Sequence, residues 1–78
     1  MKYIKFGIYK SIIIFPCVIE HSNFRIFNPV SAGFCYIEQD KVKCFGESTS
    51  LDLKSNEIED TLVATKQYIG IDAMLNLV

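Results

Sequence analysis

The sequence predicts an α+β domain, in which a small antiparallel sheet of four or five strands is covered on one face by one C-terminal helix, at about residues 56–69. Three observations support this prediction: alternating apolar residues near the start, a hairpin pattern in the middle and helical spacing near the end. A chain of 78 residues is near the lower size limit for one stable core. We therefore expect residues 1–78 to form a single domain.

Two strands are predicted in the first part of the chain. Ile4, Phe6 and Ile8 alternate with more polar residues, which is the period of a half-buried strand. Residues 10–15, "KSIIIF", are apolar on both faces and predict a buried central strand. Residues 16–24 fit a short helical turn and a loop equally well, because they begin with a proline.

The segment "SAGFCYIEQDKVKCFGES" predicts a β-hairpin centred on Gln39 and Asp40. A four-residue type I connection is expected, because Gln-Asp is not favoured in two-residue turns. The register places apolar residues on one face and polar or aromatic pairs on the other, and it makes Cys35 and Cys44 facing, buried thiols. The expected pairs are Glu38 with Lys41, Ile37 with Val42, Tyr36 with Lys43, Cys35 with Cys44 and Phe34 with Phe45.

The helix follows the hairpin. Asn56 is expected to cap it, with Glu59 closing a capping box. Ile58, Leu62, Thr65 and Ile69 recur at helical spacing, with Val63 beside them, and this face is expected to pack on the core. The apolar tail, residues 71–78, is expected to pack on the sheet or to contact a partner.

The charge balance argues against nucleic acid as a partner. Eight basic and nine acidic residues give a net charge of −1, so no excess of positive charge is present to neutralise phosphates. Lys2, Lys5 and Lys10 are close together in the sequence and are expected to be solvated strand positions.

We expect a cytoplasmic protein without a membrane partner. The longest apolar run is far shorter than the ~20 residues that a membrane helix needs. The basic and apolar start of the chain contains Pro16 and lacks a small-residue cleavage site, so it does not fit an export signal. Three cysteines without a Cys-x-x-Cys pair suit a reducing compartment.

The stretch "CFGESTS", residues 44–50, contains a thiol, an acid and hydroxyls but no catalytic motif. It lacks the last glycine of a nucleophile elbow and the second glycine and lysine of a phosphate-binding loop. We expect Gly46 to bend the chain and the polar residues to form a small binding surface. With the aromatic face of the hairpin, the candidate binding residues are Glu47, Ser48, Ser50, Phe34, Tyr36 and Phe45.

An alternative reading is a zinc-stabilised domain or a cysteine-dependent enzyme that uses Cys17, His21, Cys35 and Cys44. Three cysteines and one histidine match the stoichiometry of structural zinc. The spacing argues against it, because zinc ligands usually occur in pairs two to four residues apart. We therefore expect no metal and no cofactor, and we expect His21 to be a polar loop residue.

Three segments, "FPCVIEH", "VSAGFCYIEQDKVKCFGESTSLDLKS" and "EDTLVATKQYIG", resemble a set of short, uncharacterised bacterial proteins often carried by prophages. The resemblance covers about residues 14–70. It transfers no catalytic residue. It implies an accessory or anti-defence factor that binds a host protein.

The apolar content predicts association with another protein. Half of the residues are apolar, and a small globule has too little interior to bury that much apolar side chain. A homodimer is the simplest way to bury the remainder. The sequence therefore predicts a small, non-enzymatic interaction module that forms a homodimer.

Overall fold

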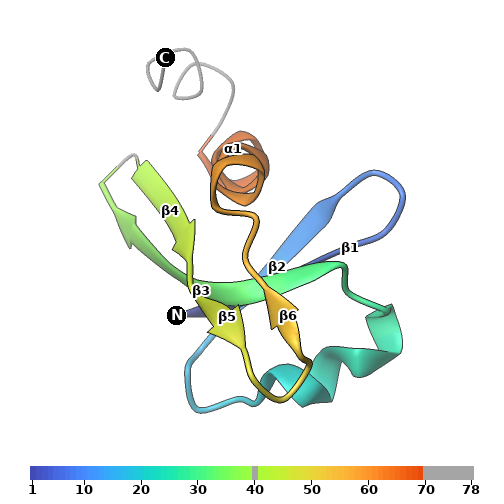
Figure 1. Cartoon of the computed structure of the whole chain (residues 1–78). Helices are drawn as coiled ribbons and strands as arrows, with labels where there is room; N and C mark the ends of the chain where they lie inside the picture. Colours follow the sequence, from blue (N-terminus) through green and yellow to red (C-terminus); the bar gives the residue numbers. More distant parts are fainter. Residues whose placement is uncertain (40, 70–78) are drawn as a thin grey trace.

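The predicted α+β fold is confirmed by a computed structural model that describes residues 1–39 and 41–69. The structure contains a four-stranded antiparallel sheet, a two-stranded sheet and a C-terminal helix, which packs on the larger sheet (Figure 1). The apolar tail, residues 71–78, lies outside the described residues. The elements are β1 (Lys2–Phe6), β2 (Ser11–Phe15), the 3-10 helix η1 (His21–Phe27), β3 (Ser31–Glu38), β4 (Lys41–Phe45), β5 (Glu47–Ser48), β6 (Leu53–Lys54) and α1 (Glu57–Tyr68).

The four strands of the larger sheet lie in the order β2-β1-β3-β4, so β2 is an edge strand. The expectation that residues 10–15 form a central strand is therefore wrong. β2 is apolar on both sides because each side meets a different core: Ile12 lies under α1 and Phe15 lies in the core beneath η1. Ile8 is also displaced from its expected place, because β1 ends at Phe6 and Ile8 is exposed in the following turn.

Side chains of α1 cover the outer edge of β2. The Gln67 amide donates to the Ile12 carbonyl oxygen at 2.7 Å, and the Ile12 N–H donates to Gln67 Oε1 at 2.9 Å. The Tyr68 hydroxyl donates to the same carbonyl at 2.6 Å. These contacts occupy backbone groups that an uncovered edge strand would offer to other chains.

The predicted register of the β3–β4 hairpin is confirmed at all five pairs. Cys35 and Cys44 are facing, buried and free, as expected. The connection is shorter than predicted, because β3 ends at Glu38 and β4 begins at Lys41. Gln39 has a φ of 53°, in the left-handed region that tight two-residue hairpin turns require.

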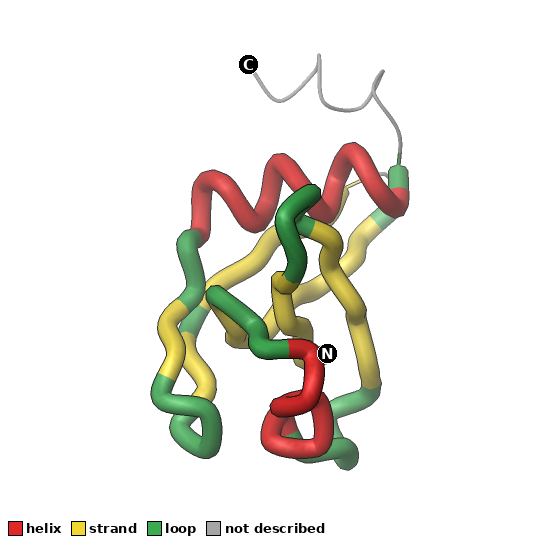
Figure 2. Tube along the Cα trace, turned by 90° about the vertical axis from the view of Figure 1, so that its right-hand side faces the viewer, coloured by secondary structure: helices red, strands yellow, loops and turns green. Residues whose placement is uncertain are grey.

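Each face of the larger sheet has its own core. The core under α1 contains Tyr3, Ile12, Cys35, Val42, Cys44 and Ala64. The opposite core is built on Ile4, Phe15 and Ala32, and Phe24 of η1 and Leu51 and Leu53 of the smaller hairpin cover it. Figure 2 shows α1 on one side of the larger sheet, with η1 and the β5–β6 hairpin on the other side. The face of the larger sheet that α1 does not cover is therefore shielded by η1 and the β5–β6 hairpin.

Two short segments contain more secondary structure than predicted. One of the two readings of residues 16–24 is confirmed in part: the Ile19 N–H donates to the Pro16 carbonyl oxygen at 3.0 Å and closes a short turn, and a 3-10 helix follows at residues 21–27. Residues 47–54, of which the polar residues 47–50 were expected only to form a small binding surface, contain the paired strands β5 and β6. Gly46 has a φ of 78° and makes the bend between β4 and β5, as predicted for this glycine.

Helix α1 begins after Asn56, as predicted, but only part of the expected face meets the core. Thr65 is buried and Val63 and Ile69 pack on the core, as expected, whereas Ile58 is 80% exposed, Leu62 is 38% exposed, and Asp60 and Ala64 are buried. The capping box is also wrong, because the Asn56 side chain accepts no capping hydrogen bond and its amide donates to Glu59 Oε2 at 3.3 Å. The described part of the chain contains no helix of the length and apolar character needed to cross a membrane.

Candidate functional site

A buried cluster of charges sets the rotation of α1. The Lys5 Nζ lies 2.6 Å from Asp60 Oδ1 and donates to Glu59 Oε1 at 2.8 Å. Asp60 Oδ2 accepts hydrogen bonds from the Tyr3 hydroxyl at 2.5 Å and the Ser31 hydroxyl at 2.8 Å. Lys5 is 3% exposed, so the expectation that it is a solvated strand position is wrong.

The Asp60 carboxylate replaces the predicted capping box. The Asn56 backbone N–H donates to Asp60 Oδ2 at 3.1 Å, so one carboxylate binds the start of α1, β1 and β3 together. Turning Ile58 and Leu62 toward the core would pull Asp60 out of these contacts and leave Lys5 buried without its partner. The polar cluster therefore explains why Ile58 and Leu62 face outward.

The protonation states of this cluster favour a structural role. Burial raises the pKa of Tyr3, and its hydrogen bond to Asp60 raises it further, so the hydroxyl stays protonated. Burial disfavours the charged form of Lys5, but hydrogen bonds and charges from Asp60 and Glu59 outweigh that effect and raise its pKa. The side chains of Tyr3 and Asp60 are both fully buried, so a substrate has no access to them.

Glu59 makes the stability of the fold depend on pH in the acidic range. Hydrogen bonds from Lys5 and then Lys10 lower the pKa of Glu59 from 4.5 to about 2. Since the folded pKa is the lower one, the stabilisation is complete above pH 4.5 and is lost as the pH falls toward 2. Urea unfolding between pH 4.5 and pH 2 should show that the free energy of unfolding falls with pH, and that it falls less steeply in Glu59→Gln than in wild type. Glu57→Gln, in the same helical turn, is the matched control, and equal slopes for Glu59→Gln and wild type would contradict this role.

The candidate residues of the 44–50 stretch separate in the structure. Glu47 and Ser50 are exposed and line a small pocket of about 360 Å³ together with His21 and Phe34. Ser48 is buried, and its hydroxyl accepts the Leu51 N–H at 3.2 Å, so its expected role in a binding surface is wrong. The serine instead holds the turn between β5 and β6.

His21 is buried, which corrects the expectation of a polar loop residue. Its Nε2 lies 2.8 Å from the Gly33 carbonyl oxygen, which can only accept, so Nε2 carries the proton. The ring meets Phe15 and Phe34 edge to face, with centroid distances of 5.5 Å and 5.8 Å. These contacts tie η1 to β3 and give His21 a packing role.

The four residues of the zinc alternative do not form a metal site. Cys17 is exposed near η1, whereas Cys35 and Cys44 lie in the core under α1. Across residues 1–39 and 41–69, no three His, Cys, Asp or Glu side chains are grouped so that they could hold a metal ion. Burial raises the pKa of the Cys35 thiol, and burial and then the charge of Cys35 raise that of Cys44 to about 12. Both shifts oppose the thiolate that a catalytic cysteine needs.

This placement predicts that one of the three cysteines reacts in the folded protein. Ellman's reagent should modify the exposed Cys17 rapidly, and it should reach Cys35 and Cys44 only after unfolding in urea. Replacing Cys17 with serine should remove the rapid phase. Rapid modification of a second thiol in the native protein would contradict the burial of Cys35 and Cys44.

The aromatic residues of the hairpin share one face, as the register predicted. Phe45 lies between Phe34 and Tyr36, with a centroid distance of 6.2 Å to each. Phe34 also contacts His21, whereas Tyr36 and Phe45 are exposed. The row of aromatic rings therefore runs from the buried His21 to the surface beside β4.

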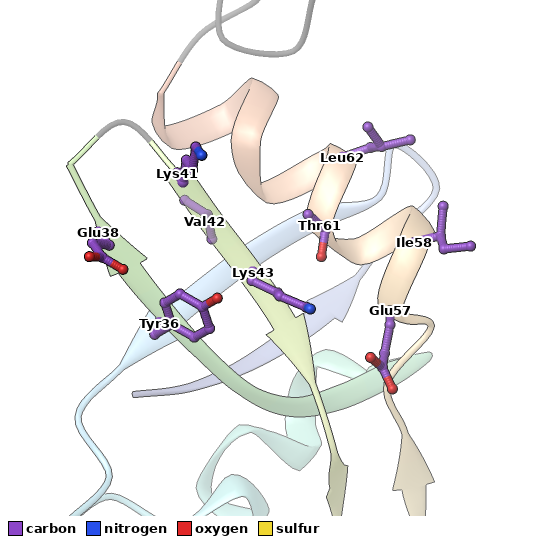
Figure 3. A pocket seen from close by; sticks show the side chains of 9 residues that line it. All are labelled: Tyr36, Glu38, Lys41, Val42, Lys43, Glu57, Ile58, Thr61 and Leu62. Atoms are coloured by element: carbon purple, nitrogen blue, oxygen red, sulfur yellow. The ribbon is translucent and has the colours of Figure 1, made fainter. Parts of the chain in front are cut away.

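A surface hollow, which we call the edge groove, lies between residues 41–43 of β4 and residues 57–62 of α1. Its volume is about 590 Å³, and Tyr36 and Glu38 complete its rim. Figure 3 shows Lys43 extending from β4 toward the side of the groove where Glu57 and Ile58 lie. The exposed apolar side chains of α1 thus lie next to the outer edge of the sheet.

Backbone groups of β4 face this groove. The Cys35 N–H donates to the Met1 carbonyl oxygen at 2.7 Å, and the Met1 amino group donates to the Cys35 carbonyl oxygen at 3.0 Å. Cys35 and Cys44 are therefore a pair without mutual hydrogen bonds, and the Cys44 N–H donates instead to Thr61 Oγ1 at 3.0 Å. Because such pairs alternate along an antiparallel ladder, the N–H and C=O of Val42 also point away from β3.

The two edges of the sheet therefore differ. On β2, the Gln67 side chain bonds to both the N–H and the C=O of Ile12. On β4, the Thr61 hydroxyl accepts the Cys44 N–H. Within residues 1–39 and 41–69, no side chain bonds to the outward groups of Val42 in this way. The sequence did not reveal this site, because the spacing of Ile58 and Leu62 is also typical of a helix face that packs on a core.

No family model, curated protein or solved structure matches the chain. The comparisons therefore assign no family and transfer no residue role to it. The resemblance to short prophage-borne bacterial proteins stays a prediction, and the arguments about function depend on the geometry of the site.

Proposed function

We propose that the protein is a non-enzymatic interaction module and that the edge groove is its protein-binding surface. The observation that carries this proposal is the outward rotation of α1, which puts Ile58 and Leu62 beside Val42 of β4, whose outward backbone groups bond to no side chain of residues 1–39 and 41–69. Contiguous exposed apolar surface on a small soluble domain often marks an interaction site. The rigid sheet and helix hold this surface in place without a partner.

The remaining polar groups support binding in preference to catalysis. Buried thiols with raised pKa values are poor nucleophiles. The Nε2 of His21 is engaged by a backbone carbonyl, and the charged cluster around Asp60 is enclosed. No described pocket combines a nucleophile, an oriented base and an oxyanion site.

We propose a heterologous protein as the occupant of the groove. The resemblance to prophage-borne proteins supports a bacterial host protein and a role as an accessory or anti-defence factor. The three free cysteines support a cytoplasmic location, where thiols stay reduced.

A matched pair of variants tests the groove. Ile58→Asp places a charge at the rim, where the helix tolerates an acid because residue 58 lies in its first turn. Ile8→Asp makes the same substitution at a position that is 92% exposed in the β1–β2 turn, outside the groove. Quantitative capture from a bacterial lysate should recover at least one protein with wild type and Ile8→Asp that is lost with Ile58→Asp. Equal capture profiles for all three proteins, or no specific capture by wild type, would contradict the proposal.

A homodimer is a second candidate, supported by apolar exposure beyond the groove. Ile8 and Tyr9 in the β1–β2 turn are 92% and 93% exposed. Sedimentation at micromolar concentration should give a species larger than the 8.9 kDa monomer. Loss of the dimer in Ile8→Asp would assign the contact to the turn, whereas loss in Ile58→Asp would assign it to the groove. A clean monomer would contradict self-association and leave a heterologous partner.

A further inference from the structure

We infer that the edge groove binds an extended acidic segment of another protein, which adds to β4 as a fifth strand of the larger sheet. The inference depends on the proposed function, because it specifies how the same groove recognises its partner. The segment it predicts has three central residues in the order acidic, apolar, acidic. The backbone of Val42, the lysines of β4 and the outward face of α1 each determine one part of this pattern.

The backbone of Val42 supplies the pairing groups. Its N–H and C=O point away from β3, because the neighbouring Cys35–Cys44 pair has its hydrogen bonds on the outer sides. The residue placed opposite Val42 can exchange two backbone hydrogen bonds with it, which is how peptides add to exposed sheet edges. Thr61 blocks the next outward N–H, that of Cys44, so strand addition centres on Val42.

Charge selects the flanking residues of the segment. Lys41 and Lys43 are exposed, lie two residues apart on β4 and line the groove, with Glu38 and Glu57 at its rim. Residues on either side of the one opposite Val42 would lie across from these lysines. Acidic side chains there are complementary, and basic ones are repelled.

The helix selects the central residue. Val42 lies on the face of β4 that packs toward α1, so the residue opposite Val42 points to that same side of the extended sheet. On that side the groove is lined by Thr61, Ile58 and Leu62. An apolar central side chain would cover the exposed carbons of Ile58 and Leu62.

The same geometry disfavours a second copy as the added strand. Pairing β4 with β4 of another copy about Val42 would place Lys41 of each chain opposite Lys43 of the other. Like charges at facing positions destabilise a strand pair. Lysines on an edge strand are a known protection against self-pairing, and here they also favour an acidic partner.

The test uses the full chain and a capped peptide of sequence Thr-Glu-Leu-Glu-Thr, titrated by NMR. We expect saturable binding with a dissociation constant on the order of 1 mM or below. The double variant Lys41→Glu and Lys43→Glu should bind at least about tenfold more weakly. It should gain affinity for the charge-reversed peptide Thr-Lys-Leu-Lys-Thr. Lys54→Glu, an exposed lysine on β6, is the matched control and should bind like wild type.

A second peptide separates strand addition from attraction between charges. N-methylation of the central leucine removes its N–H without changing any charge, so it should abolish binding if Val42 pairs with that residue. Equal binding of the methylated and unmethylated peptides would overturn strand addition, as would no binding of the unmethylated peptide. Either result would leave the Ile58→Asp capture experiment to decide separately whether the groove is a binding surface.

Discussion

Replacing Asp60 with alanine should lower the free energy of unfolding by about 3–5 kcal/mol, because it leaves a buried ammonium without its partner. Lys5 is 3% exposed and lies 2.6 Å from Asp60 Oδ1. The hydroxyls of Tyr3 and Ser31 and the N–H of Asn56 would lose their acceptor at the same time. Total stabilities of small domains are about 5–15 kcal/mol, so the variant should lose a large fraction of its stability.

Urea unfolding followed by circular dichroism measures this effect. Glu57→Ala, which removes an exposed acid from the same turn of α1, is the matched control and should stay within about 0.5 kcal/mol of wild type. Adding Lys5→Met to the Asp60 variant should restore part of the loss, because the unpaired charge is then removed as well. A cost below about 1 kcal/mol for Asp60→Ala would show that the cluster does not determine the position of α1.

Replacing Gly33 with alanine should cost about 3 kcal/mol, because the new methyl group would overlap backbone atoms that cannot rotate away. A Cβ on Gly33 would collide with the Phe45 carbonyl oxygen and would lie 3.3 Å from the Gly46 carbonyl carbon and from Ser55 Cβ. β3 passes here against the chain leaving β4, so relief requires the two segments to move apart. Gly33 also accepts the hydrogen bond from His21, so η1 should loosen with it.

Gly7→Ala separates this clash from backbone strain. Gly7 has a φ of 81° with no atom within 4 Å of an added Cβ, so its substitution should cost only about 1 kcal/mol. Thermal unfolding should therefore rank the melting temperatures as wild type, then Gly7→Ala, then Gly33→Ala. A Gly33→Ala protein as stable as Gly7→Ala would contradict the close crossing of β3 over Phe45.

The β3–β4 hairpin could be predicted in detail because its information is local. Opposite charges at Glu38 and Lys41 and two facing cysteines fix one register, and a slip by one residue would exchange the two faces. The start of α1 at Asn56 was also predictable, because acids in the first turn mark a helix N-terminus.

The rotation of α1 could not be predicted from the same kind of information. Ile58 and Leu62 have the spacing of a core face, but the buried face is chosen by Asp60 and its partners on β1 and β3. Those partners are 29 and 57 residues away in the sequence, so no local pattern reveals them. The one sequence signal for these partners was that Tyr3 and Lys5 share one side of β1. That pattern is also typical of an ordinary solvated strand face.

The candidate site was predictable only in part for a related reason. Tyr36 was expected at the surface and lines the edge groove, whereas Ser48 is buried and Glu47 and Ser50 lie at another pocket. Which strands form the edges of a sheet depends on the strand order, and no hairpin pattern determines that order. The groove therefore became visible only when β4 was placed at an edge beside α1.

Amide hydrogen exchange at Val42, measured by NMR in the full chain with and without the Thr-Glu-Leu-Glu-Thr peptide, tests the central claim most directly. In the free protein the Val42 N–H should exchange rapidly, whereas that of Lys43, which faces β3 in the alternating ladder, should be protected. Saturation with the peptide should protect Val42 and leave Lys43 unchanged. A Val42 amide that is already protected in the free protein, or one that stays unprotected when the peptide is bound, would contradict an open edge that binds a partner strand.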